Sequence, residues 1–295
     1  MLRILEVKIV SILTAIFQAI GQAIAYIFPL SENGYASVFQ DFSSRYSGKY
    51  TELTGLIYIG IALGIIFAFY KLFIKLTYEF FGGFNDLFHK RLDVKGSSTR
   101  RKFMYLTLVP FVFMPLYLIP IGDKGNIYQC IRTLSYDGNL LSEGICFVLT
   151  ATILLLASIK LSKSEKVKQY TLPVAVILGV AIFFTLPLAG LSLSAAIISI
   201  SILLDVNKKT AVRYFVSISA PLLIVKGIIE IVACETYVNI FAGIIGVVLG
   251  AVISYFACKF LVFIVNTYKL KYFSYYNFAL GAILIIVGII EILTK

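Results

Sequence analysis

The chain has 295 residues, of which 60% are hydrophobic and 14% charged, and its mean hydropathy is +0.94. This composition excludes an ordinary soluble domain and a disordered chain, and it predicts an integral membrane protein. The net charge of +11, from 26 basic and 15 acidic side chains, would indicate a nucleic-acid partner in a soluble protein. In a membrane protein, basic cytoplasmic loops and anionic lipid headgroups account for it, so we expect a membrane partner and no nucleic acid.

Nine apolar runs divide the chain, and most reach the roughly 20 residues that a helix needs to cross a bilayer. The run at 191–204 is too short and carries four serines, which favours a broken or re-entrant helix. We therefore predict an all-α, polytopic integral membrane protein. The runs lie at about 4–30, 54–81, 103–121, 144–159, 171–188, 191–204, 212–233, 237–265 and 273–293.

Loop charges predict the orientation. Basic residues gather in the loops at 82–102 and 160–168 and near 208–213, whereas the loops at 31–53 and 122–143 carry acids. The positive-inside rule places the basic loops in the cytoplasm and the acidic loops outside. The side of the N-terminus stays open, because the first apolar unit could itself be re-entrant.

Two similar stretches break their helices at a proline. The sequence GQAIAYIFPL at 21–30 is repeated as GVAIFFTLPL at 179–188, and a short polar turn follows each proline, Pro29 and Pro187. Broken helices at corresponding places in two halves indicate a binding site in a repeat-built membrane protein. We predict one membrane domain, 1–295, with related halves at about 1–160 and 171–295. Each half would contain one broken or re-entrant helix, and the two polar turns would meet.

The cysteines and the single histidine give no metal site. Cys130, Cys146, Cys234 and Cys258 lack the spacing of a metal motif, and His89 lies in a basic loop. A Cys130–Cys146 disulfide and simple apolar filling by these side chains are both open alternatives.

The first broken unit resembles a motif of the undecaprenyl-diphosphatase (bacitracin-resistance) family. That motif is a glutamate, three residues, a second glutamate, then Phe-Leu-Pro-Val-Ser-Ser-Thr-Gly-His, and the segment from Gln22 to Tyr35 is in register with it. The family's Pro-Gly-x-Ser-Arg-Ser-Gly resembles 190–195, and its Phe-x-x-Tyr-Arg resembles 273–277. The likeness keeps order and spacing over almost the whole chain.

The resemblance implies a multi-pass protein of the bacterial plasma (inner) membrane. It implies a polyprenyl (di)phosphate ligand, and hydrolysis of undecaprenyl diphosphate to the monophosphate at the outer face, in carrier recycling for cell-wall peptidoglycan. Mg²⁺ or Ca²⁺ would assist if that activity is retained. A monomer and a homodimer are both open.

Several chemically important positions of the family's motifs are substituted. The two glutamates are replaced by Gln22 and Tyr26, the histidine by Tyr35, and the two arginines by Leu193 and Asn277. Glutamine neither titrates nor anchors a metal well, and leucine cannot clamp a phosphate. One acid is gained, because Glu32 stands where the family has its second serine.

The candidate site follows from these matches, with no metal ligand among its members. The candidate catalytic residues are Ser31, Glu32 and Ser192. The candidate substrate-binding residues are Gln22, Tyr26, Asn33, Gly34, Tyr35, Ser194 and Asn277.

Each candidate also has a plain structural interpretation. Ser31 is a natural helix cap, Glu32 suits a helix start, and serines in a broken helix bond to backbone. Tyrosines are common at the headgroup level. Two functional hypotheses stay open: a divergent phosphatase, or a non-catalytic binder, flippase or sensor of the carrier lipid. Since Glu32 is the only acid expected near the turns and no cation is evident, the second is favoured.

Overall fold

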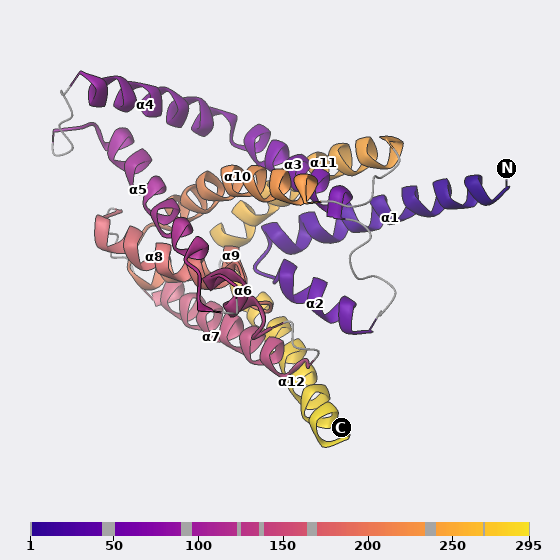
Figure 1. Cartoon of the computed structure of the whole chain (residues 1–295). Helices are drawn as coiled ribbons and strands as arrows, with labels where there is room; N and C mark the ends of the chain where they lie inside the picture. The colour runs from indigo at the N-terminus through magenta and orange to yellow at the C-terminus, as the bar shows by residue number, and fades with distance from the viewer. Residues whose placement is uncertain are drawn as a thin grey trace.

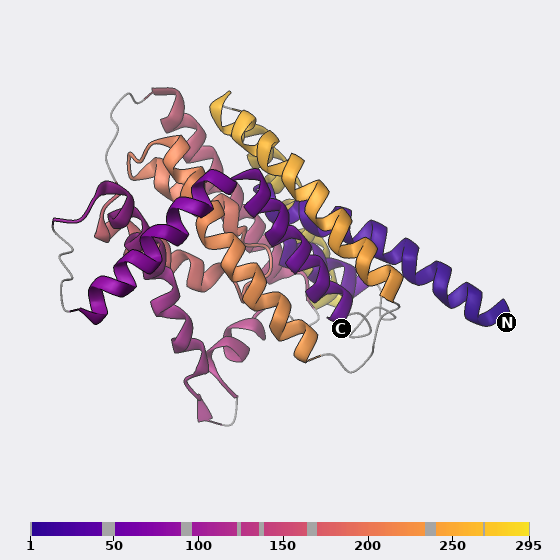
Figure 2. The same cartoon turned by 90° about the horizontal axis from the view of Figure 1, so that it is seen from above.

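The structure is a computed structural model that describes residues 2–42, 51–89, 96–122, 125–135, 139–163, 170–233, 240–267 and 269–294. Within these ranges the chain is helical and forms no β-sheet (Figures 1 and 2). The elements are α1 (Leu2–Ile27), α2 (Glu32–Phe42), α3 (Thr51–Ala68), α4 (Tyr70–Phe88), α5 (Thr99–Phe113), the 3-10 helix η1 (Met114–Leu118), α6 (Ile127–Arg132), α7 (Leu141–Lys163), α8 (Leu172–Thr185), α9 (Leu193–Leu203), α10 (Lys208–Val232), α11 (Ile240–Asn266) and α12 (Leu270–Thr294).

Four of the described helices are long and apolar enough to cross a bilayer: α7 over Leu141–Leu161, and α10, α11 and α12 over their full lengths. A fifth span results if α3 and α4 are counted as one broken span. This confirms the predicted all-α, polytopic membrane protein. The run at 103–121 does not form one long helix, because α5 stops at Phe113 and η1 follows.

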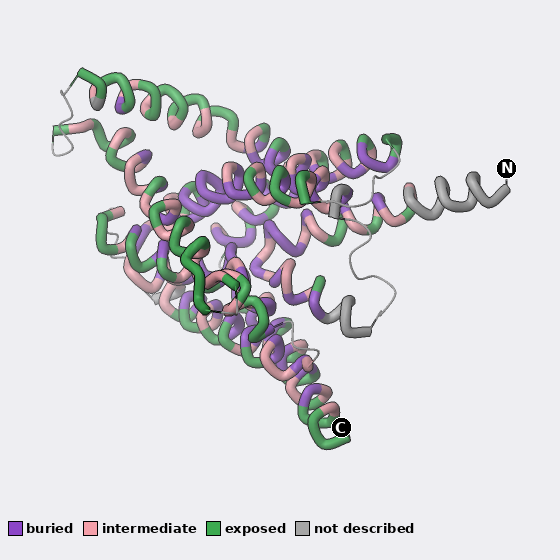
Figure 3. Tube along the Cα trace, in the orientation of Figure 1, coloured by how far each residue is buried: buried purple, intermediate pink, exposed green. Residues whose placement is uncertain are grey.

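The outward sides of the helices are apolar, as lipid contact requires. Large side chains such as Phe17, Phe256 and Val232 are exposed on the surface of the bundle. Figure 3 shows buried residues concentrated where the helices meet and exposed ones along their outer sides. Because lipid tails are as apolar as these side chains, the helices are held together by close packing and polar contacts in the interior.

The apolar run at 54–81 is two helices and not one. The axes of α3 and α4 differ by 95° at a break at Phe69. Lys259 of α11 donates from Nζ to the carbonyl oxygen of Ala68 at 2.9 Å, which satisfies one of the backbone acceptors that end α3. A lysine from a distant helix therefore stabilises a break that no proline or glycine marks.

Helices α3 and α10 approach closely at a pair of glycines. A Cβ atom on Gly55 would lie 2.6 Å from the carbonyl oxygen of Gly227, and one on Gly227 would lie 2.7 Å from the carbonyl oxygen of Gly55. Only glycine allows this approach, which is the close backbone packing typical of membrane helices. It brings Tyr58 of α3 and Lys226 of α10 into the same region of the interior.

Both predicted helix breaks are present. α1 ends at Ile27, before Pro29, and α2 begins at Glu32; α8 ends at Thr185, before Pro187, and α9 begins at Leu193. With 11 residues, α9 is too short to span a bilayer, as its serines and length predicted. The division into two related halves stays a prediction.

The alternative of a Cys130–Cys146 disulfide is wrong, because both thiols are free in the structure. Cys146 is buried in α7, and Cys258 is a second free, buried cysteine in α11. Their small apolar side chains fill interior space. Cys234 lies outside the described residues.

Candidate functional site

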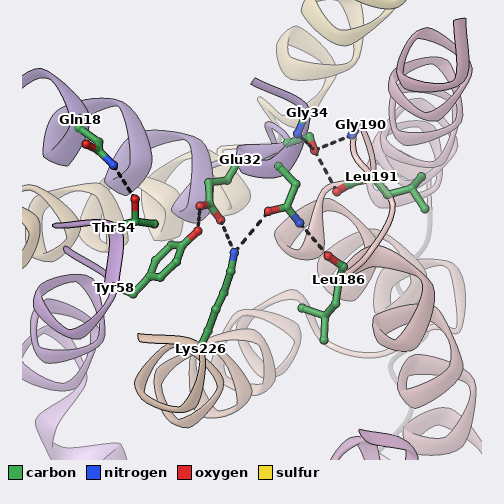
Figure 4. A network of polar contacts seen from close by, with 11 residues as sticks. Gln18, Glu32, Gly34, Thr54, Tyr58, Leu186, Gly190, Leu191 and Lys226 are labelled. Carbon is green, nitrogen blue, oxygen red and sulfur yellow. Dashed lines mark hydrogen bonds and ion pairs between the residues drawn. The ribbon is translucent and has the colours of Figure 1, made fainter. Parts of the chain in front are cut away.

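The two polar turns meet, and Ser31 joins them. Its hydroxyl accepts hydrogen bonds from the backbone N–H of Gly34 at 3.1 Å and from that of Gly190 at 3.0 Å, and it donates to the carbonyl oxygen of Leu191 at 3.1 Å (Figure 4). The first bond caps α2, and the other two reach across to the turn between α8 and α9. The predicted meeting of the turns is confirmed, and the cap is part of the contact.

Two further hydrogen bonds run between the turns, one in each direction. Ser194 Oγ donates to the carbonyl oxygen of Phe28 at 2.7 Å, and Asn33 Nδ2 donates to the carbonyl oxygen of Leu186 at 2.8 Å. Each turn thus satisfies backbone groups that the helix break in the other leaves free, which apolar surroundings require. Ser192 caps α9, with Oγ accepting from the N–H of Ala195 at 3.3 Å.

Glycines allow the two turns to fit against each other. Gly190 has a φ of +92°, and a Cβ atom there would lie 2.6 Å from the carbonyl oxygen of Glu143. Gly34 faces the same contact, since a Cβ there would lie 2.8 Å from the backbone nitrogen of Gly190. The candidate binding residue Gly34 is therefore a packing position between the turns.

The three candidate hydroxyls are enclosed by this contact. Ser31, Ser192 and Ser194 are buried, and the Oγ atoms of Ser192 and Ser194 lie 3.2 Å apart. In this conformation the Ser31 proton is directed at a backbone carbonyl. The bonds they make are the structural ones that a cap and a broken helix predict, and a nucleophilic role stays a prediction.

A charged cluster lies beside the first turn. Glu32, at the start of α2, accepts a hydrogen bond from the Tyr58 hydroxyl at Oε1 and forms an ion pair with Lys226 Nζ through Oε2 at 3.3 Å. Lys226 Nζ also lies 3.3 Å from Asn33 Oδ1 and 4.2 Å from the centre of the Tyr58 ring, a cation–π distance (Figure 4). The ion pair is largely enclosed: the Glu32 side chain is 9% exposed and that of Lys226 26%.

Lys226 corrects the expectation that no cation lies near the turns. It follows Glu32 by 194 residues and lies in the largely apolar run at 212–233, so spacing could not link the two. A signal was nevertheless present. An ionisable residue inside a membrane-spanning segment is by default a candidate for function, with a partner to be found.

Glu143 is a second acid that the analysis of the loops missed. It was assigned to the external loop at 122–143, yet it lies in the first turn of α7 and is fully buried. Ser37 Oγ donates to its Oε1 at 2.7 Å, and Ser142 Oγ donates to its Oε2 at 2.9 Å. The side chain of Glu143 thus links α7 to α2, and its backbone carbonyl packs against Gly190, so Glu32 is not the only acid in this region.

The remaining candidates are brought together around the first break. Asn277 Nδ2 donates to the carbonyl oxygen of Pro29 at 2.9 Å, and the Tyr35 hydroxyl donates to that of Tyr276 at 2.5 Å. Tyr26 is not at an exposed interfacial position, because it is buried against the ring of Phe215. Among the described residues, the Tyr26 hydroxyl, Gln22 Oε1 and Asn277 Oδ1 are buried without a hydrogen-bond partner.

The donor set of the site does not fit a divalent cation. The described part of the chain contains no group of three or more histidine, cysteine, aspartate or glutamate side chains that could hold a metal ion. The carboxylate of Glu32 is already neutralised by an ammonium group at 3.3 Å, which would repel Mg²⁺ or Ca²⁺. Gln22 and Tyr26 supply only neutral oxygens.

Comparison with known proteins gives a match along nearly the whole chain. The family model described as "Bacitracin resistance protein BacA" matches residues 15–283. The undecaprenyl-diphosphatase of Alkaliphilus metalliredigens is 27% identical over 284 residues, covering 94% of this chain and 98% of its own. The undecaprenyl-diphosphatase of Halothermothrix orenii is also 27% identical, over 288 residues that cover 94% of this chain and 98% of the relative. That of Methanosphaera stadtmanae is 25% identical over 289 residues, which cover 95% of this chain and 99% of the relative.

Proposed function

Because this chain belongs to the bacitracin resistance protein BacA family, we propose that it binds the headgroup of a polyprenyl (di)phosphate carrier lipid where its two polar turns meet. The site would face the outer side of the bacterial plasma membrane. The lipid would be bound without hydrolysis, so that the protein presents, moves or senses the carrier. The observation that carries this proposal is the ammonium group of Lys226 beside two joined helix breaks.

The electrostatics of the turns favour an anionic headgroup. Helices α2 and α9 both begin at these turns. The backbone N–H groups at the start of a helix, together with the helix dipole, attract phosphate. Lys226 adds an ammonium group that is paired with Glu32 in this conformation, within a span of low dielectric where a charge–charge contact is stronger than in water. The undecaprenyl-diphosphatases to which the chain is similar act on such a lipid, which supports the choice of ligand.

The chemistry of the side chains favours binding over turnover. Gln22 and Tyr26 offer no carboxylate pair for a metal or a proton, and Leu193 offers no clamp for phosphate oxygens. Glu32 is held by Lys226 and Tyr58, and Ser31 by backbone groups of the other turn. Removal of even one preorganised donor typically lowers a rate by about 100- to 1000-fold.

The second candidate function is the phosphatase reaction itself, which the names of the relatives favour. In that case Ser31 or Ser192 would attack or orient the phosphorus, and Glu32 would serve as acid and base. Lys226 would then stabilise the negative charge that develops on the transferred group.

Two measurements on the purified protein separate these functions. Binding of undecaprenyl phosphate would be measured by native mass spectrometry in detergent, with undecaprenol, the uncharged alcohol, as the control lipid. Phosphate release from undecaprenyl diphosphate would be measured with and without Mg²⁺ or Ca²⁺. We expect binding that depends on the phosphate group and negligible release. Robust metal-dependent release that is lost in Glu32→Gln or Ser31→Ala would establish the phosphatase instead.

A further inference from the structure

The position of Lys226 within its helix is unusual for a lysine. It lies 18 residues after Lys208 at the start of α10 and 6 residues before its end at Val232. At a rise of about 1.5 Å per residue, its backbone is about 27 Å from the first end and about 9 Å from the second. An ionisable side chain inside a membrane span is costly unless it has a partner, and it is by default a candidate for function.

Within the part of the chain that the structure describes, the partners of Lys226 come from the elements around the first turn. The ion pair with Glu32 and the contact with Asn33 Oδ1 come from α2, and the ring under the ammonium group is Tyr58 of α3. Both carboxylate oxygens of Glu32 are engaged, one by Lys226 and the other by Tyr58. A carboxylate at the first position of α2 is thus bound in the way that an anionic ligand would be.

Unsatisfied polar atoms lie next to this cluster. The Tyr26 hydroxyl lies within reach of the Ser219 hydroxyl and near the carboxylate of Glu32. The oxygens of Tyr26 and Ser219 are buried without a hydrogen-bond partner in the described structure, and so is Gln22 Oε1, one helical turn before Tyr26. The two hydroxyls can turn toward each other, but such a pair uses only one of their two protons, so the other stays free to donate to a ligand rich in acceptor oxygens.

From these observations we infer that Lys226 is the cation that receives the ligand's phosphate, and that Glu32 is a built-in competitor that holds Lys226 until the ligand arrives. This inference rests on the proposed function of the same site. Phosphate oxygens replace the Glu32 carboxylate on the ammonium group, and Tyr26 and Ser219 donate to them. Glu32 keeps its hydrogen bond from Tyr58. Because the displaced carboxylate stays near the phosphate, their repulsion weakens binding and speeds release.

The test uses the full-length protein with three site variants and two matched controls. Glu32→Gln removes the competing charge, Lys226→Gln removes the cation, and Lys226→Arg keeps it. The first control is Lys259→Gln, which removes another lysine from a spanning helix. The second is Glu79→Gln, which neutralises an acid on α4 that is paired with Arg101; α4 lies away from the turns (Figure 1). Dissociation constants for undecaprenyl phosphate, undecaprenol and inorganic phosphate would be measured for each.

We expect Glu32→Gln to bind undecaprenyl phosphate about tenfold more tightly than the wild type, with binding of undecaprenol unchanged. Lys226→Gln should bind it at least about tenfold more weakly, and Lys226→Arg should stay close to the wild type. Neither control should change the affinity. A gain in affinity in Glu32→Gln is not expected of a merely structural ion pair, because removing one partner of such a pair destabilises the folded protein.

Failure of this inference differs from failure of the proposed function. Unchanged or weaker binding of undecaprenyl phosphate by a folded Glu32→Gln protein would overturn the exchange while leaving the lipid-binding function in place. Absence of binding to the wild type and to every variant would overturn the function. Binding of inorganic phosphate alone, tightened by Glu32→Gln, would keep the exchange and replace the lipid as the ligand. If Lys226→Gln does not fold, Glu32→Gln and Lys226→Arg decide the question.

Discussion

The single hydroxyl of Ser31 is expected to contribute a large share of the stability of the turn contact. In Ser31→Ala, α2 loses its cap, which typically costs about 1 kcal/mol, and the buried N–H of Gly190 loses its acceptor, which costs about 1–3 kcal/mol. The expected loss is therefore about 2–4 kcal/mol in the free energy of unfolding. This corresponds to a change of about 30- to 700-fold in the folding equilibrium.

The measurement is reversible unfolding in mixed detergent micelles, with Ser217→Ala as the control. Ser217 is also buried, but its hydroxyl donates only to the carbonyl oxygen of Arg213 in its own helix, so its removal should change stability by less than about 0.5 kcal/mol. If Ser31→Ala and Ser217→Ala are equally stable, the turns are not held together through Ser31. The account of the site as two joined breaks would then be wrong.

Three further predictions concern backbone strain, orientation and catalysis. Gly190→Ala should destabilise the protein by about 1–3 kcal/mol, because the φ of Gly190 is positive and Cys146 leaves no space for a Cβ atom. The control is Gly21→Ala in the same unfolding assay. A Cβ atom on Gly21 would meet no other atom within 4 Å, so this change should be neutral or stabilising by up to about 1 kcal/mol. In a cysteine-free background, a thiol-reactive impermeant label should modify Leu134→Cys in intact cells but Ser97→Cys only after the membrane is opened; labelling of Ser97→Cys from outside would reverse the orientation. Restoring the family's charged groups should raise phosphate release from undecaprenyl diphosphate above that of the wild type, and no gain would show that more than these groups is missing. The variant is Gln22→Glu, Tyr26→Glu, Tyr35→His and Leu193→Arg together.

Local features of the sequence were enough to predict the helix breaks at Pro29 and Pro187. A proline followed by a short polar turn inside an apolar run leaves few alternatives, since proline ends a helical ladder and serine caps the next helix. The meeting of Ser31 with the second turn followed from the similarity of two ten-residue stretches. Composition alone predicted the membrane.

Contacts between distant residues were beyond sequence reasoning. Gly55 and Gly227 let α3 and α10 come together, which brings Lys226 to Tyr58, and Tyr58 in turn donates to Glu32. The bend at Phe69 depends in the same way on Lys259, which caps a carbonyl 191 residues before it. Tyrosines are common at the headgroup level, and this general frequency gave the wrong environment for Tyr26. Its burial is decided by tertiary packing against Phe215 of α10.

The order of synthesis matters for the first helix break. The carbonyl oxygen of Phe28 accepts a hydrogen bond from Ser194. That of Pro29 accepts one from Asn277, which lies 248 residues further along the chain. At about 5–20 residues per second, a ribosome needs about 12–50 s to make that distance. A carbonyl left bare in lipid costs several kcal/mol, so during this interval the break must stay in contact with water or with the insertion machinery. The break between α1 and α2 is therefore expected to gain its last hydrogen bonds only after α12 has been made.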